Sequence, residues 1–66
     1  MERIVIDAQN EGYNFKQIQN TMTVGELIEL LQDFDKDTKI YLSFDNRYTV
    51  GGLRAGMIEA EEADED

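Results

Sequence analysis

The hydrophobic positions between residues 22 and 34 follow the spacing of an α-helix. Those that fall on one helical face are Val24, Leu27, Ile28, Leu31 and Phe34. Thr23 directly precedes this run, and Glu26 lies three positions after Thr23. This is the spacing of a capping box, in which the side chain of each residue accepts a hydrogen bond from the backbone amide of the other. The pattern predicts one amphipathic helix over about residues 23–34.

Alternating or β-branched hydrophobic positions predict strands on both sides of this helix. The clearest period of two lies at 39–44, where Ile40, Leu42 and Phe44 alternate with more polar residues. Segments 3–8 and 13–19 have strand character before the helix. After it, 48–53 starts like a returning strand that Gly51 and Gly52 interrupt, and 55–60 offers a short last strand.

These elements predict a small α+β domain of order ββαββ, with a mainly antiparallel sheet and the helix packed on one face. We expect strand 39–44 to be central, with Ile40, Leu42 and Phe44 under the helix. Residues 1–58 are expected to form a single compact domain and residues 59–66 an acidic C-terminal tail. Val5, Tyr13, Tyr41 and Tyr48 are expected on the opposite face, as a dimer seam or a partner site.

Charge narrows the choice of partners. The 66 residues contain fifteen acidic and six basic residues, a formal charge of −9, and six of the acids lie in the last eight residues. Direct binding of nucleic acid is disfavoured because no basic residues cluster. A basic protein surface is the expected partner. The tail is either a solubilising end or part of an acidic array that imitates a phosphate backbone.

The residue inventory argues against an enzyme. There is no histidine and no cysteine, so the usual general base near neutral pH and the strongest nucleophile are both missing. Asp45 near Ser43 lacks a visible base and an orienting partner. We expect no catalytic residue, no cofactor and no membrane span. The lack of cysteine is more typical of a cytoplasmic protein than of a secreted one.

Two motifs resemble ligand sites. Asp33, Asp35 and Asp37 start like a calcium loop, but the sixth position is Thr38 where glycine is needed and the twelfth is Phe44 where glutamate is needed. We therefore expect no metal. The pair Gly51 and Gly52 predicts a turn or bulge with positive φ.

Arg47 and Arg54 flank that glycine pair. They are expected to pair with nearby acids, although an assembly with this loop at a seam would enclose a small anion between subunits.

The stretch Thr21 to Ser43, TMTVGELIELLQDFDKDTKIYLS, resembles small proteins encoded by bacteriophages and prophages. These commonly carry a T-V-G-E-L-I-E-x-L helix, a D-x-D-T linker and an alternating strand. In size, acidity and lack of catalytic residues the chain is also similar to phage inhibitors of host defence, including anti-CRISPR proteins. The resemblance implies a phage origin and a protein that acts by occupying a surface.

The leading hypothesis is therefore a non-enzymatic acidic binding protein, a phage-encoded inhibitor that blocks the basic nucleic-acid groove of a host defence nuclease. The residues expected to contact the partner are Glu29, Asp33, Asp35, Asp37, Tyr41, Asp45, Tyr48, Glu59, Glu61 and Glu62. A homodimer is an open possibility. Two alternatives stand beside this hypothesis: an oligomeric small-ligand module, as a sponge or sensor would be, and a structural or accessory phage protein.

Overall fold

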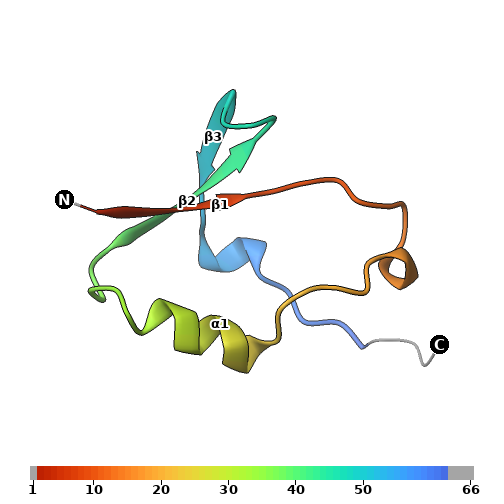
Figure 1. The fold of residues 1–66 in the computed structure, drawn as a ribbon, viewed down its shortest axis with the longest axis horizontal. Helices are drawn as coiled ribbons and strands as arrows, with labels where there is room; N and C mark the ends of the chain where they lie inside the picture. Colours follow the sequence, from red (N-terminus) through yellow and green to blue (C-terminus); the bar gives the residue numbers. More distant parts are fainter. Residues whose placement is uncertain (1, 63–66) are drawn as a thin grey trace.

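A three-stranded sheet and one helix form the framework of the protein (Figure 1), seen in a computed structural model that describes residues 2–62. The strands are β1 (Arg3–Asp7), β2 (Lys39–Phe44) and β3 (Thr49–Gly52), and the helix is α1 (Val24–Leu31). Two short 3-10 turns, η1 (Phe15–Gln17) and η2 (Ala55–Met57), complete the order. The expected α+β class is confirmed.

The sheet has the order β1-β2-β3, with β2 in the centre as expected. β1 and β2 are parallel, with Ile4 opposite Ile40, whereas β2 and β3 are antiparallel, with Leu42 opposite Gly51. A parallel pair needs a long crossover, and the connection from β1 to β2 contains both η1 and α1. The sheet is therefore mixed, not mainly antiparallel.

Helix α1 starts at the predicted cap. The Thr23 amide donates to Glu26 Oε1 at 2.8 Å, and the Glu26 amide donates to Thr23 Oγ1 at 3.2 Å, which closes the capping box. The helix ends at Leu31, three residues before the predicted end, through a tighter bond from the Phe34 amide to the Leu31 carbonyl. Its last turn has no basic residue to offset the helix dipole.

Two of the expected strands do not form. In 13–19 the Tyr13 amide donates to the Gln17 side chain at 2.6 Å and the chain turns through η1, so this backbone is satisfied locally and not by a neighbouring strand. In 55–60 the amides of Met57 and Ile58 bond back to Arg54 and Ala55, which gives η2.

The expected positive φ at Gly51 and Gly52 is also wrong, since both lie within β3 and no described glycine has positive φ. The left-handed residues are instead Asp45, Asn46 and Arg47, with φ of 52°, 55° and 72°. The Tyr48 amide donates to the Asp45 carbonyl at 3.1 Å, so Asn46 and Arg47 make a turn with positive φ at both centres, the kind that suits a β-hairpin.

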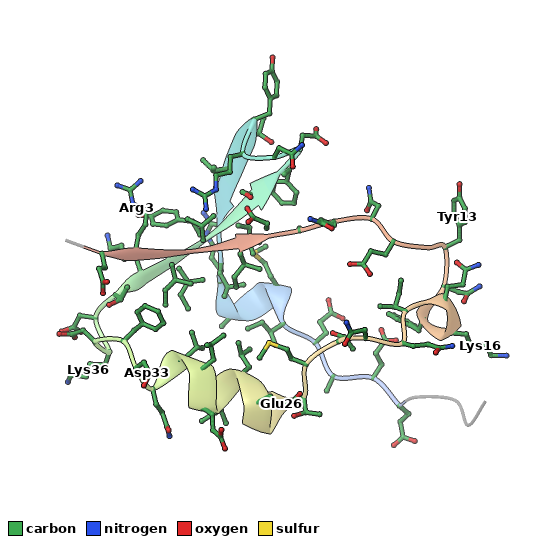
Figure 2. The ribbon with its side chains drawn as sticks, in the orientation of Figure 1. Arg3, Tyr13, Lys16, Glu26, Asp33 and Lys36 are labelled. Carbon is green, nitrogen blue, oxygen red and sulfur yellow. The ribbon has the colours of Figure 1, made fainter. Side chains whose placement is uncertain are left out.

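The two faces of the sheet differ. Helix α1 lies beyond one face, and Figure 2 shows Arg3 directed to the opposite side of β1. By strand alternation the face of Arg3 also carries Val5 and Tyr41, as expected for those two residues, while Ile40 and Leu42 point toward the helix. Tyr13 and Tyr48 lie outside the sheet, in the loop before η1 and in the hairpin turn.

The layers between sheet and helix are loosely filled. Among residues 2–62 no apolar side chain is buried, and Ser43, at 1% exposure, is the one buried residue. The radius of gyration is 13.8 Å, against about 11 Å for a compact domain of this length.

Candidate functional site

An open hollow of about 590 Å³ lies where the connection after α1 meets the starts of β1 and β2. We call it the corner hollow. It is lined by Glu2, Arg3, Asp35, Asp37, Thr38, Lys39 and Tyr41. Three of the residues predicted from the sequence to contact a partner, Asp35, Asp37 and Tyr41, therefore come together here.

The acidic side of the corner hollow is held in place by its own turn. Asp35 Oδ1 accepts a hydrogen bond from the Asp37 amide at 3.0 Å, and the Asp35 carbonyl accepts one from the Thr38 amide at 3.0 Å. Asp residues stabilise turns in this way. Both carboxylates remain exposed to solvent. The turn therefore fixes the Asp35 carboxylate and the backbone of Asp37, so the Asp35 side chain has little freedom left to lose on binding.

The rest of the hollow contributes an aromatic ring and two positively charged side chains. Tyr41 is half-buried on β2, and Arg3 and Lys39 are opposite each other in the β1–β2 register. Carboxylates bind guanidinium and ammonium groups through charge-assisted hydrogen bonds, and a tyrosine ring face attracts cations. The carboxylates and the Tyr41 ring can therefore bind a basic side chain of a partner. Arg3 and Lys39 would repel that side chain, so it would have to approach from the side of Asp35 and Asp37.

The other predicted contact residues are spread over the molecule. Asp33 lies at the same end as Arg3 and Lys36 (Figure 2), and Glu29 is exposed on α1. Asp45 and Tyr48 belong to the β2–β3 turn. Glu59, Glu61 and Glu62 follow η2 and are exposed, and the remaining acids of the tail, in 63–66, lie outside the described residues. None of these residues lines the corner hollow, so the predicted contact residues do not all belong to one site.

A second cluster joins residues that sequence reasoning did not connect. The Ser43 hydroxyl donates to Asp7 Oδ1, and Arg47 Nε lies 3.6 Å from the same oxygen. Asp7 and Ser43 are opposite each other at the ends of the parallel strands. Only the pairing of two strands 36 residues apart along the chain reveals this contact.

The cluster has a structural role. Ser43 is almost fully buried and its proton is already donated, so its oxygen is not placed to attack a substrate from solvent. Arg47 pairs with an acid as expected, which leaves it less available for a small anion. The Arg54 guanidinium lies over Gly52, about 3.3 Å from where a Cβ atom would be.

Neither a metal centre nor a spanning helix is found in the part of the chain that the structure describes. No three acidic side chains of residues 2–62 converge as ligands of a metal ion would, and this includes Asp33, Asp35 and Asp37. Helix α1 has eight residues, and no helix within 2–62 is long and apolar enough to cross a bilayer.

The comparisons with known proteins add no relative. When the chain is compared with family models, with curated proteins and with solved structures, none of the three finds a match.

Proposed function

We propose that this chain is a non-enzymatic binding protein that docks on a basic protein surface through the corner hollow. The observation that carries the proposal is the meeting of Asp35, Asp37 and Tyr41 in one hollow, with the acidic turn locked by its own hydrogen bonds. The lack of histidine and cysteine, together with the buried position of Ser43, supports binding over catalysis.

Docking would place an arginine or lysine of the partner between the two carboxylates and against the Tyr41 ring. The Asp35 carboxylate is preorganised by its bond to the Asp37 amide, which lowers the conformational entropy lost on binding. The formal charge of −9 would speed the approach of a basic partner, with a strong dependence on salt. A protein acting in this way belongs in the cytoplasm beside its target.

The partner we propose is the nucleic-acid groove of a host defence nuclease, and the chain would be a phage-encoded inhibitor of it. Such a groove carries the arginines and lysines that contact phosphates, and these are the side chains that the corner hollow accepts. The phage assignment rests on the resemblance of residues Thr21 to Ser43 to phage proteins.

The experiment compares two variants with equal loss of charge. Fluorescence anisotropy measures the binding of a labelled octa-arginine peptide to the protein, to Asp35→Asn/Asp37→Asn and to Asp45→Asn/Glu59→Gln. Asparagine at position 35 keeps the Oδ1 acceptor, so the turn is retained. Each carboxylate interaction is of order 1 kcal/mol, so we expect Asp35→Asn/Asp37→Asn to weaken binding by about tenfold or more, and the control variant by much less.

Equal weakening by the two double variants would mean that total charge alone attracts the peptide, and the corner hollow would lose its role. The nuclease assignment is tested separately. Added protein should lower DNA cleavage by a nuclease from a phage host, and it should not bind labelled single-stranded DNA. Binding of that DNA, or an unchanged cleavage rate under saturating protein for every nuclease of the host, would contradict inhibition.

A further inference from the structure

The surface of the single chain is too large for a finished globular protein. The chain exposes 6818 Å², whereas a folded monomer of 7.6 kDa exposes about 4,300 Å². The surplus of about 2,500 Å² is roughly three times the 800 Å² that each partner contributes to a stable interface of standard size. The chain therefore has enough uncovered surface for a large interface.

Exposed apolar side chains belong to the elements on either side of the space between the sheet and α1. We call these side chains together the interlayer surface. Its members are exposed by about two-fifths or more of their area and comprise Ile6, Met22, Val24, Leu27, Ile28, Leu30, Phe44, Met57 and Ile58. They come from β1, β2 and α1, from Met22 just before α1, and from the end of η2 with Ile58 after it. In the view of Figure 1, η2 lies between α1 and the sheet. Several exposed large apolar side chains on neighbouring elements favour an interaction site over ordinary solvent-exposed surface.

A second apolar feature projects from the same chain. After β1 the backbone runs outward to η1 and returns toward α1, and we call residues 9–18 the arm (Figure 1). Tyr13 is 101% exposed and Phe15 is 85% exposed. Figure 2 shows Tyr13 at the far end of the arm, directed away from α1 and from the sheet. Large aromatic side chains in this position are typical anchors of protein interfaces.

The arm has a fixed shape despite its exposure. The Tyr13 amide is bound by the Gln17 side chain, and the Ile18 amide donates to the Phe15 carbonyl at 3.0 Å. A Cβ atom at Gly12 would lie 2.6 Å from Gln17 Oε1 and 2.9 Å from Gln17 Cβ, and since the Gln17 Cβ atom is fixed to the backbone of η1, this close approach favours glycine. The aromatic rings are therefore presented by a preformed turn, which lowers the entropy lost on docking.

We propose that this protein is a homodimer in which the arm of each copy covers the interlayer surface of the other. One chain carries both the exposed anchor and the uncovered apolar surface. A two-fold axis would therefore satisfy both copies at once, as in other isologous dimers. The uncovered area is as large as obligate dimers require. This inference is independent of the proposed function, since the corner hollow contains no residue of the arm or of the interlayer surface.

Charge does not prevent this arrangement. Six of the fifteen acids lie in the last eight residues, so residues 1–58 carry nine acids against six bases. At physiological ionic strength, charges separated by more than about 8 Å are largely screened from one another.

Sedimentation equilibrium tests the dimer with two variants matched in exposure. The intact protein should have twice its chain mass of 7.6 kDa. Phe15 and Tyr48 are both 85% exposed in the single chain, so either change to serine should leave a monomer equally folded. Because a dimer would bury two copies of Phe15 and neither copy of Tyr48, we expect Phe15→Ser to raise the dissociation constant by about a hundredfold or more, and Tyr48→Ser by less than about threefold.

Disulfide trapping gives a second measurement that does not depend on how well Phe15→Ser folds. The chain has no cysteine of its own. Phe15→Cys mixed with Ile28→Cys should form a mixed disulfide under mild oxidation, and Tyr48→Cys mixed with Ile28→Cys should not. A monomeric intact protein, equal effects of the two serine variants, or equal trapping of the two cysteine pairs would each overturn the proposal.

Discussion

Ser43 is buried where β1 and β2 end side by side, and its hydroxyl donates to the carboxylate of Asp7. A buried hydroxyl without a partner is costly, so the acceptor on the neighbouring strand makes serine acceptable at this position. Arg47 approaches the same carboxylate from the hairpin turn. These three residues connect β1, β2 and the turn before β3.

The hydrogen bond of Ser43 is testable by two substitutions. Ser43→Ala removes the donor, and we expect the free energy of unfolding to fall by about 1–2 kcal/mol. Asp7→Asn keeps an oxygen at the acceptor position and removes only the charge that faces Arg47, an exposed pair worth about 0–1 kcal/mol. Urea denaturation measures both variants. An alanine variant as stable as the original protein, or an asparagine variant that loses more than the alanine variant, would contradict this role.

The helix illustrates how a local sequence signal becomes structure. Thr23 and Glu26 form the capping box that their spacing predicts, and it satisfies two amides at the start of α1. Because few tertiary contacts cover α1, the cap should matter more here than in a well-buried helix.

Removal of the cap should therefore shorten or fray α1. We expect Thr23→Ala to lower the free energy of unfolding by about 1 kcal/mol and to reduce the helical signal in far-ultraviolet circular dichroism. Glu26→Gln retains both bonds of the box and should have little effect. Thr21→Ala, two residues before the cap, controls for the loss of a threonine. If Thr23→Ala melts like Thr21→Ala, the capping box contributes nothing measurable.

The elements that the sequence predicted correctly are those whose signals are local. The helix follows from its cap and period, and β2 follows from its alternation of polar and apolar residues. The sheet topology depends on how β1 returns to β2 across the long connection of residues 8–38, and no local pattern specifies that pairing. Segments 13–19 and 55–60 have apolar residues but no regular alternation, and side-chain and 3-10 bonds replaced the strands expected there.

The candidate site was predictable in part for the same reason. Asp35 and Asp37 could be recognised as candidate contact residues from the linker sequence. Tyr41 could be recognised because it alternates with the apolar residues of β2 and so falls on the other face of the strand. Their neighbours Glu2 and Arg3 come from the opposite end of the chain. Only the parallel register, in which Arg3 lies opposite Lys39, brings them to the same hollow.

The whole chain combines two surfaces with different chemistry. The corner hollow is small, charged and locally rigid, whereas the interlayer surface is large and apolar. In our account the apolar surface completes the fold with a second copy, and the charged hollow remains free to bind a partner. A dimer would present two corner hollows to one basic surface, which would raise the overall affinity without any new contact.

We propose that the fold gains much of its stability from burial of the interlayer surface against a second copy. The most direct test is urea denaturation of the intact protein at about 2 µM and about 200 µM, followed by circular dichroism, since mass action makes the stability of a dimer depend on concentration. We expect a higher urea midpoint at the higher concentration. A single cooperative transition with the same midpoint at both concentrations would show that the isolated chain is a complete fold.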